Sequence, residues 1–276
     1  MKVISFVNMK GGVAKTTLAV NVAYCLSEHK HEKVILIDID PQFNATQCLI
    51  APESYKQMLD NDLSTIIDVF DYLPKAKAST VSGTRIEEPA KLEDIHPTRL
   101  TDNLYLLPGN IQLFRLEMSP GEGREYRLKR YLETISKEYN FAIIDTPPTP
   151  SVWMSTALIA SDYYVVPCKP EPLSATGIDL LRMVVEHKKE NYGLSIKCAG
   201  LVLTITEQHT KAYREAVDFI DKDPFWNSYR FKYELPKRTE IAFLQGTQQT
   251  IFQSKDYGVA MDIVRITDEL LERINQ

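Results

Sequence analysis

The sequence lacks a run of apolar residues long enough to cross a membrane. A membrane-spanning helix needs about 18 or more apolar residues in succession, and every apolar run in this 276-residue chain is shorter. The first run, residues 3–7, is followed closely by Asn8 and Lys10, so it is also too short for the apolar core of a signal peptide. These absences predict a cytoplasmic protein.

Cysteine is scarce, and positive charge is not in excess. The four cysteines, Cys25, Cys48, Cys168 and Cys198, are too dispersed for the C-x-x-C spacing of a zinc or iron–sulfur site. Lysine and arginine number 32 against 37 aspartates and glutamates, which gives a net charge of −5. Bulk charge therefore cannot attract nucleic acid, and any contact with DNA has to come from a local basic patch.

Hydrophobic residues, by contrast, make up 44% of the chain, which is enough for one full core. Strand-like apolar runs recur along the sequence, with helical patterns between most of them. This alternation predicts a single α/β domain, residues 1–276, with a mainly parallel twisted sheet and helices on both faces. The expected strands are 3–7, 34–37, 104–107, 141–144, 163–166 and 199–205.

Residues 9–17, Met-Lys-Gly-Gly-Val-Ala-Lys-Thr-Thr, stand between the first strand and a segment with apolar residues at helical spacing. A glycine-rich turn in that position presents backbone N–H groups and a helix N-terminus to a phosphate. Lys15 would supply charge and Thr16 a hydroxyl group for Mg²⁺. The segment departs from the standard pattern G-x-x-x-x-G-K-[ST] at Met9 and Ala14. It predicts a phosphate-binding loop of unusual sequence.

Two acidic motifs follow strands that should end at the same edge of the sheet. Asp38 and Asp40 come at the end of the second strand, and Asp145 follows the run Phe-Ala-Ile-Ile. The carboxyl edge of an open α/β sheet is where ligands bind. An acid at the end of an apolar strand has the form of a Walker B site, which holds Mg²⁺, usually through water. The loop and these acids together predict an ATP site.

These segments resemble the ParA/MinD family of dimerising ATPases. Residues 10–17 are similar to the family's deviant Walker A loop, K-G-G-x-G-K-[ST]-T, except at Ala14, and residues 38–46 are similar to its D-x-D-P-Q-x-N-A-T stretch. The resemblance is nearer to ParA (Soj-like) proteins without an N-terminal helix-turn-helix domain than to MinD. It covers nearly the whole chain except 74–97 and about 207–235. If the loop needs a left-handed backbone at Ala14, that residue should cost about 1–2 kcal/mol.

The resemblance implies roles for the site residues. Lys10 would reach across a two-fold interface to the phosphates of the partner, so that ATP joins a homodimer. Asp40 would orient or activate the attacking water, with Asp38 supporting it or the metal, and Asp145 would hold a water of the metal. Pro236, in a turn similar to the family's I-P-R-N, would lie against adenine. The expected contacts to ATP and Mg²⁺ are Lys10, Gly11, Gly12, Val13, Ala14, Lys15, Thr16, Thr17, Asp38, Asp40, Asp145 and Pro236.

The resemblance further implies a ParA-type partition ATPase that segregates plasmid or chromosome. Its ATP-bound dimer would coat double-stranded DNA non-specifically, so that it is nucleoid-associated, without a membrane partner. A ParB-like centromere-binding adaptor protein would stimulate its slow hydrolysis. Basic residues late in the chain are the candidates for DNA contact: Lys211, Arg214, Arg230, Lys232, Lys237 and Arg238, with Lys255 as a further one.

Two other functions stay open on the sequence alone. A MinD-like membrane-cycling ATPase needs a basic amphipathic C-terminal helix, whereas the apolar stripe in residues 259–274 is accompanied mainly by acids, which favours a docked helix. A metabolic small-molecule kinase or synthetase of the same fold is the other alternative. Residues 74–97, which include three prolines, are predicted to be a solvated loop or insertion.

Overall fold

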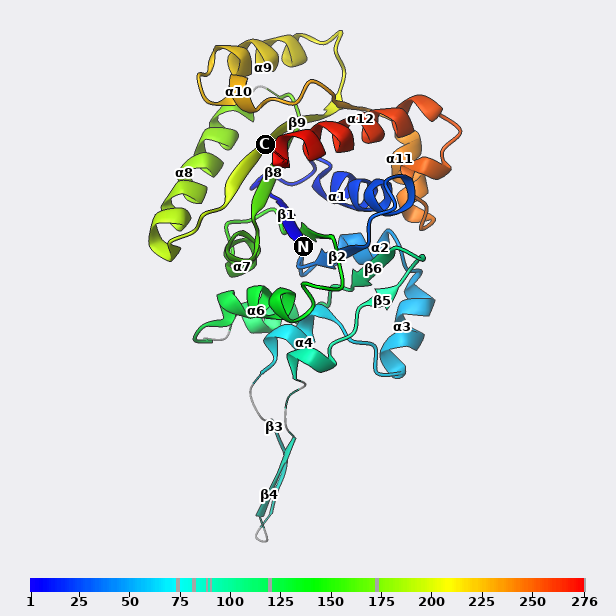
Figure 1. Ribbon diagram of the computed structural model, residues 1–276, viewed down its shortest axis with the longest axis vertical. Helices are drawn as coiled ribbons and strands as arrows, with labels where there is room; N and C mark the ends of the chain where they lie inside the picture. Colours follow the sequence, from blue (N-terminus) through cyan, green and yellow to red (C-terminus); the bar gives the residue numbers. More distant parts are fainter. Residues whose placement is uncertain are drawn as a thin grey trace.

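The computed structural model describes residues 1–72, 75–80, 83–87, 89, 91–118, 121–171 and 174–275. Figure 1 shows a central sheet covered by helices, with a hairpin that projects from one end. The strands of the sheet are β1 (Lys2–Phe6), β2 (Val34–Asp38), β5 (Thr98–Arg99), β6 (Leu104–Leu107), β7 (Phe141–Asp145), β8 (Tyr163–Cys168), β9 (Lys197–Thr206) and β10 (Leu235–Pro236). Their order is β10-β9-β8-β1-β7-β2-β6-β5, and every neighbouring pair is parallel except β5 and β6.

This sheet confirms the predicted α/β class. All six predicted strands are present, with bounds that differ by no more than two residues. Every residue of β2 and of β7 is buried, as expected for parallel strands that are covered on both faces. The two-residue strands β5 and β10 were not predicted, because a segment that short carries no periodic apolar pattern.

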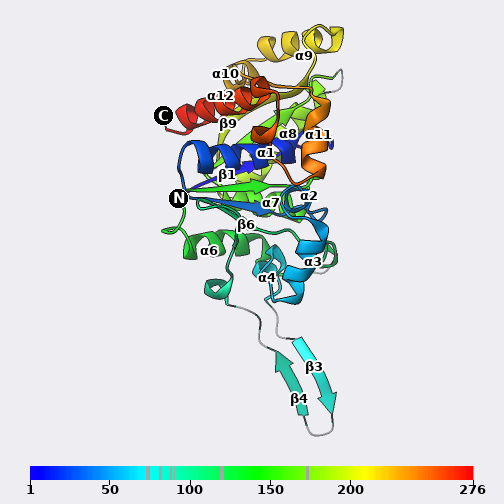
Figure 2. The same cartoon turned by 90° about the vertical axis from the view of Figure 1, so that its right-hand side faces the viewer.

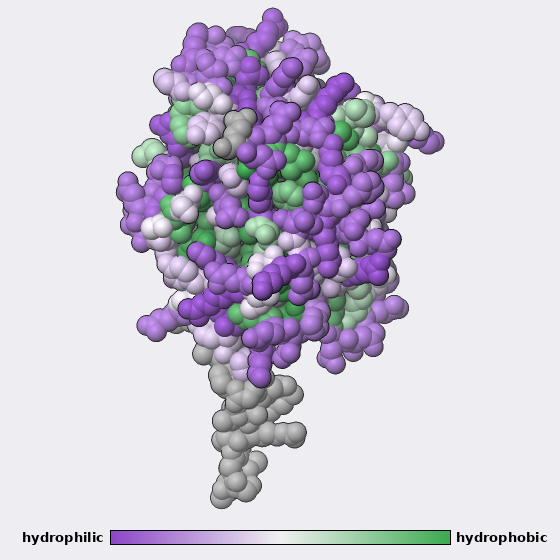
Figure 3. All heavy atoms as spheres, in the orientation of Figure 1, coloured by the Kyte–Doolittle hydropathy of each residue, from purple (hydrophilic) through white to green (hydrophobic). Residues whose placement is uncertain are grey.

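Helices cover both faces of the sheet and turn their apolar sides inward, while polar residues cover most of the surface seen in Figure 3. The helices are α1 (Lys15–Tyr24), α2 (Asn44–Gln47), α3 (Pro52–Asp60), α4 (Ile66–Phe70), α5 (Leu113–Glu117), α6 (Arg127–Thr134), α7 (Val152–Ala160), α8 (Ser174–Tyr192), α9 (Lys211–Lys222), α10 (Trp226–Tyr229), α11 (Thr239–Gly246) and α12 (Tyr257–Ile274). Short helical turns are η1 (Cys25–His29), η2 (Leu92–Asp94), η3 (Arg124–Tyr126) and η4 (Ile251–Gln253). Leu18 of α1 and Ile263 of α12 share one core cluster, and Leu128 of α6 and Trp153 of α7 share another.

The parallel register brings the carboxyl ends of the central strands together. Asp38 at the end of β2 is paired with Asp145 at the end of β7, and Phe6 at the end of β1 is paired with the same Asp145. The loop that follows β1 and the two acidic strand ends therefore meet at one edge of the sheet. That edge is where the sequence predicts the ligand site.

The region predicted to be a solvated loop contains a β-hairpin. Strands β3 (Lys75–Thr80) and β4 (Gly83–Glu87) pair antiparallel, and Figures 1 and 2 show that they project away from the sheet. Residues 74, 81, 82, 88 and 90 of the predicted loop lie outside the described part of the chain. Ile86 is the only large apolar residue in the sequence of the two strands. The segment thus lacks the alternating apolar pattern by which a strand is recognised.

The last helix, α12, is docked on the sheet as the sequence predicts. Arg273 donates hydrogen bonds to the carbonyl oxygens of Ala199, Tyr229 and Arg230. Within the described part of the chain, no helix is both long and apolar enough to span a membrane. The apolar stripe of α12 is packed in the core, with at most 3% of each residue exposed: Val259, Ile263, Ile266, Leu270 and Ile274.

Candidate nucleotide-binding site

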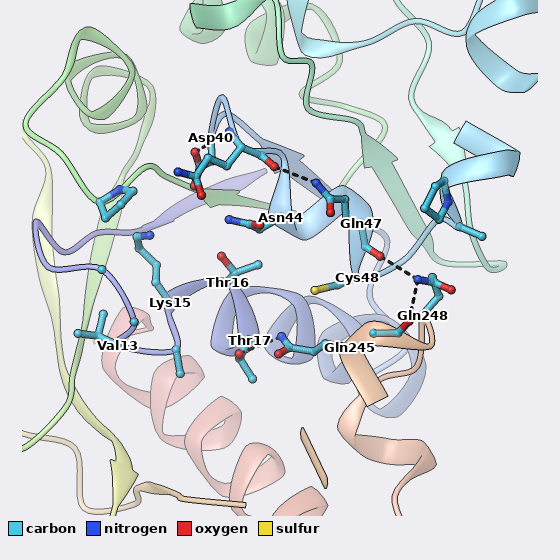
Figure 4. A pocket seen from close by; sticks show the side chains of 18 of the residues that line it. Val13, Lys15, Thr16, Thr17, Asp40, Asn44, Gln47, Cys48, Gln245 and Gln248 are labelled. Carbon is cyan, nitrogen blue, oxygen red and sulfur yellow. Dashed lines mark hydrogen bonds between the residues drawn. The ribbon is translucent and has the colours of Figure 1, made fainter. Parts of the chain in front are cut away.

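A cavity of about 800 Å³ opens at the carboxyl edge of the sheet. The loop between β1 and α1 forms one wall, and α2, the start of α3 and the end of α11 form the others. Figure 4 shows Lys15 and Thr16 at the start of α1, with Asp40 and Asn44 facing them. The loop residues that line the cavity are the predicted ones: Lys10, Gly11, Gly12, Val13, Ala14, Lys15, Thr16 and Thr17.

Two strands hold this loop in place. The side-chain oxygen of Asn8 accepts a hydrogen bond from Lys10 N at 2.8 Å, and its Nδ2 donates to Pro167 O at 2.6 Å. Thr204 Oγ1, on β9, donates to Val13 O at 2.8 Å. The loop is therefore tied to the ends of β8 and β9 on one side, while α1 continues from its other end.

The loop enters α1 through a left-handed residue. Ala14 has φ 55° and ψ 31° and is the N-cap of the helix, and Gly12 has φ 70°. This is the conformation in which an alanine was expected to cost about 1–2 kcal/mol, because its Cβ lies too close to the following carbonyl oxygen. The glycine found at this position in the family pattern carries no such cost.

Ala14→Gly is therefore expected to stabilise the chain. Removing the left-handed penalty of about 1–2 kcal/mol, less about 0.4–1 kcal/mol for the greater freedom of glycine in the unfolded state, should raise Tm by about 2–3 °C. Differential scanning calorimetry measures the change. The matched control Ala216→Gly, inside right-handed α9, should lower Tm instead. A lower Tm for Ala14→Gly would contradict the strain assigned to Ala14.

Lys15 and Thr16 lie beside the acid at the end of β7. Thr16 Oγ1 donates a hydrogen bond to Asp145 Oδ2 at 2.7 Å, and only 7% of Lys15 is exposed. Burial raises the pKa of the Asp145 carboxyl above its usual range, and the Lys15 charge and the Thr16 hydroxyl partly offset that rise. The other oxygen, Asp145 Oδ1, is buried and has no hydrogen-bond partner among the described residues.

An unpartnered buried carboxylate oxygen beside a threonine hydroxyl fits a hard cation such as Mg²⁺. The described residues include no group of three or more histidine, cysteine, aspartate or glutamate side chains placed to hold a metal ion. Mg²⁺ in ATPases does not need such a group, because phosphate oxygens and waters supply most of its ligands. Thr16 and Asp145 are the residues that fit the metal.

The two acids at and just beyond the end of β2, Asp38 and Asp40, occupy different places. Asp40 lines the cavity, and its Oδ1 accepts a hydrogen bond from Gln42 N at 2.9 Å. Asp38 is fully buried behind it. Asp38 Oδ2 accepts hydrogen bonds from Thr46 N and Thr46 Oγ1, both at 2.8 Å, and its Oδ1 accepts one from Asp40 N at 3.3 Å. This places Asp38 as a support for the Asp40 turn rather than as a wall of the cavity.

Asp38 should make the nucleotide-free chain sensitive to pH. Burial, and next the neighbouring Asp145 charge, raise the pKa of Asp38 to about 8. The folded chain thus keeps this proton when the unfolded chain has lost it, so the stability is full below about pH 4 and declines as pH rises toward the folded pKa. Asp38→Asn removes the titration but keeps an oxygen for Thr46.

Between pH 5 and pH 8 the Tm of Asp38→Asn is expected to rise relative to that of wild type by about 7–14 °C, because wild type loses about 1.4 kcal/mol per pH unit while only its folded state holds the proton. Thermal melting in the absence of nucleotide measures it. Asp60→Asn, at an exposed position on α3, is the control and should follow wild type at both pH values. A constant difference would show that Asp38 does not titrate in this range.

A smaller cavity of about 240 Å³ adjoins the loop at the ends of β9 and β10. Gly12, Ala14 and Thr17 line both cavities. Gln245 of α11 also lines both, and its Nε2 donates to Thr17 Oγ1 at 2.9 Å. The other lining residues are mostly apolar, but two of them are cations. They are Ile205, Leu235, Pro236, Lys237, Arg238, Ile241 and Ala242. The predicted adenine contact Pro236 thus lies beside the phosphate loop.

The candidate DNA-binding cations are mostly paired with acids. Lys211 lies 3.4 Å from Glu215, Arg230 2.9 Å from Asp221, Lys237 3.1 Å from Glu207, and Arg238 2.9 Å from Asp256. Two candidates have other neighbours: Arg214 donates to backbone carbonyls, and Lys232 Nζ lies 5.4 Å from the centre of the Tyr233 ring. The region is therefore nearly neutral within one chain.

Several residues that shape the site were not found from the sequence. Asn8 and Thr204 hold the loop, Gln245 joins α11 to α1, and Thr46 binds Asp38. Gly109 donates from its N–H to Thr46 Oγ1 at 2.8 Å, and a Cβ on it would lie 2.5 Å from Phe43 Cβ. These residues act through neighbours that are distant in the sequence, so no local spacing identifies them.

The fold and this site define the chain as a P-loop nucleotide-binding protein. A family model described as AAA domain matches residues 1–197. Over 243 residues the chain is 30% identical to the sporulation initiation inhibitor protein Soj of Bacillus subtilis. The matched region covers 87% of this chain and 86% of Soj. The chain belongs to the ParA/Soj family of partition-type ATPases.

Solved structures share the fold over almost the full length. A plasmid partition protein of Borrelia burgdorferi bound to AMPPNP has a TM-score of 0.73 at 20% identity, over 99% of this chain and 98% of that one. Cobyrinic acid a,c-diamide synthase of Mycobacterium smegmatis, with bound ADP and magnesium, has a TM-score of 0.73 at 24% identity, over 100% and 96%. The same architecture therefore occurs in proteins of different function.

Proposed function

We propose that this chain is a ParA-type partition ATPase that binds ATP with Mg²⁺ and hydrolyses it slowly. The observation that carries the proposal is that one cavity gathers the phosphate loop, Lys15, Thr16 and Asp40, with the buried Asp145 hydrogen-bonded to Thr16 behind its wall. Phosphoryl transfer to water needs a positioned water and donors for the phosphate oxygens, with little covalent chemistry. Each requirement has a candidate residue here.

The phosphates would lie against backbone N–H groups of residues 11–17 and the ammonium group of Lys15. Mg²⁺, held by Thr16 and through water by Asp145, would neutralise phosphate charge when bound. Asp40 would accept a proton from the attacking water or orient it, since its carboxylate lines the cavity. Asp38 would hold the Asp40 turn in position from behind.

The small apolar cavity would take the base. A purine needs an apolar slot next to the phosphate site, with a few polar groups at its edge. The cavity around Pro236 and Ile241 has that character, and it shares the polar side chains of Thr17 and Gln245 with the phosphate site. This supports a nucleoside triphosphate, rather than inorganic phosphate, as the ligand.

Two subunits would enclose the nucleotides, with Lys10 of each contacting the phosphates held by the other. Lys10→Ala should therefore leave ATP binding measurable but abolish ATP-dependent dimers. Titration calorimetry measures the binding, and light scattering with ATP and Mg²⁺ measures the mass. Lys129→Ala, at an exposed position on α6, is the control and should still dimerise. If dimers persist in Lys10→Ala, that lysine is not part of the interface.

The ATP-bound dimer would bind double-stranded DNA without sequence preference, and a ParB-like adaptor would stimulate its hydrolysis. Because most of the candidate cations are paired with acids, affinity would depend on two subunits presenting Arg214 and Lys232 together. Such binding should weaken steeply with salt. The protein would then be cytoplasmic and associated with the nucleoid when it holds ATP.

A gel shift with random-sequence duplex tests the DNA proposal. Retardation is expected with ATP but not with ADP or without nucleotide. The affinity for DNA should fall by about tenfold or more between 50 and 200 mM salt. The double variant Arg214→Ala/Lys232→Ala should bind DNA more weakly than wild type. Lys137→Ala, at an exposed position far in the sequence from both residues, should bind DNA as wild type does. Equal retardation with ADP and with ATP would refute nucleotide control of DNA binding.

One observation favours a second candidate, a small-molecule kinase or synthetase. The larger cavity extends past the phosphate loop to Gln47, Cys48, Pro52 and Glu53, which leaves room for a second substrate. An assay of phosphate release from ATP separates the two. Release with DNA or an adaptor protein present, and no other substrate, supports a partition ATPase. Release that depends on an added metabolite supports a kinase or synthetase. The buried stripe of α12 gives no comparable support to a MinD-like membrane helix.

A further inference from the structure

Lys10 is held by an acid of its own chain. Its ammonium group forms an ion pair with Glu171 Oε2, and the other carboxylate oxygen, Glu171 Oε1, pairs with Lys169. Glu171 lies just beyond the end of β8. The backbone of Lys10 is fixed toward the same strand by Asn8, which bonds both Lys10 N and Pro167 O. The amine of Lys10 is therefore held by a residue just beyond β8, and its backbone by Asn8, which is itself bonded to the end of β8.

This ion pair is accessible to a docking molecule. The side chains of Lys10 and Glu171 are 40% and 32% exposed, and Lys10 lines the mouth of the nucleotide cavity. A triphosphate of the other subunit that engages this ammonium group would lie beside the Glu171 carboxylate, and the two anions repel each other. Contact with the phosphates of a partner is therefore more favourable once Lys10 has left Glu171.

We propose that Glu171 is a positioning residue for Lys10: it holds the amine on its own subunit until phosphates bound to a second copy of the chain displace it. This inference rests on the ATP-dependent dimer proposed above. Lys169 makes the exchange easier. Because it already pairs with the other oxygen of Glu171, the carboxylate keeps a cationic partner after Lys10 has left.

The proposal sets the direction of the effect of each substitution. Glu171→Gln removes the competing charge, so the dimer should form at a protein concentration about two- to five-fold lower, the range for an exposed ion pair. Of the two lysines that pair with Glu171, Lys169→Ala removes the one that does not have to leave. Lys10 is then held more strongly, so the dimer should form only at a higher protein concentration. Opposite effects from two neighbouring residues are not expected from a general loss of structure.

The experiment is sedimentation equilibrium of the full chain with AMPPNP and Mg²⁺, for wild type, Glu171→Gln, Lys10→Ala and the double variant Lys10→Ala/Glu171→Gln. Glu171→Gln should dimerise more tightly than wild type, and the gain should vanish in the double variant, because Glu171 acts through Lys10. The gain should also shrink at 1 M salt, which screens the ion pair. Glu186→Gln, which breaks the exposed pair with Lys189 on α8, should behave as wild type. Circular dichroism checks folding, with Glu171→Ala as a second neutral variant.

The failure of this inference can be told apart from failure of the dimer proposal. If wild type dimerises with AMPPNP and Lys10→Ala does not, but Glu171→Gln dimerises no more tightly than wild type, the role of Glu171 is overturned and the dimer stands. If dimers form in Lys10→Ala and Glu171→Gln strengthens them as much as it strengthens wild type, the roles of both Lys10 and Glu171 are overturned, although an ATP-dependent dimer stands. If wild type binds AMPPNP but forms no dimer, both proposals are overturned.

Discussion

Lys15→Ala should weaken ATP binding in the presence of Mg²⁺ by about 30- to 4,000-fold. Removing one member of a buried charge pair costs about 2–5 kcal/mol, and each 1.4 kcal/mol is tenfold in affinity. Lys15 is nearly buried and lies in a cavity that also contains the carboxylate of Asp40. Without the lysine, a triphosphate would enter a site whose remaining side-chain charges include acids that repel it.

Titration calorimetry with ATP and Mg²⁺ measures this loss. Lys137→Ala, at an exposed position after α6, removes a lysine of the same kind and should bind as wild type. Circular dichroism should show that both variants are folded, since Lys15 also lies near the buried Asp145 carboxyl. An affinity of Lys15→Ala within about threefold of wild type would remove the phosphate loop from the ATP site.

Asp40→Ala should bind ATP and dimerise but lose turnover. A positioned acid–base group contributes about 10²–10⁴ in rate, so kcat should fall by at least about 100-fold while the Kd for ATP changes little. A small change in Kd is expected because Asp40 faces the cavity as an anion and is not a contact that holds the phosphates. Phosphate release under single-turnover conditions, beside calorimetric binding, separates the two quantities.

Asp40→Asn separates chemistry from structure. Asparagine keeps an oxygen that can accept the hydrogen bond from Gln42 N but cannot take a proton from water at neutral pH. If Asp40 acts on the water, both variants should be inactive. Full activity in Asp40→Asn would mean that Asp40 only shapes the turn, and ATPase rates equal to wild type in Asp40→Ala would contradict any catalytic role.

The sequence was sufficient for the parts of the site that follow from local pattern. The phosphate loop and the strand that ends at Asp145 each depend on a few neighbouring residues, and the structure has them where they were expected. The left-handed backbone of Ala14 fulfils a condition that was taken from the family's glycine at that position. Parallel strands end at the same edge of a sheet, so Asp38 and Asp145 were expected to lie close together even though the register of β2 and β7 was not known. The roles of these residues in catalysis remain predictions.

The contacts that could not be predicted are those between side chains far apart in the sequence. Glu171 is 161 residues from Lys10, and Gln245 is 228 residues from Thr17. Nothing in the local sequence of Lys237 indicates that its charge is met by Glu207. The local pattern alone did not separate Asp38 from Asp40, because the strand ends at Asp38 and the chain turns before Asp40. Their different roles were expected only from the family resemblance.

The two ends of the chain lie side by side, at the edge of the sheet opposite the cavity. Lys2 Nζ donates a hydrogen bond to Ile274 O at 3.0 Å, and Tyr163 OH donates to the same oxygen at 3.1 Å. Figure 2 shows both termini on one side of the molecule, with α3 and α11 on the other. A fluorescent protein or surface tether fused at either terminus would therefore lie away from the larger cavity. Joining the ends with a short glycine linker would allow the chain to be reopened at an exposed turn elsewhere, which makes it suited to circular permutation.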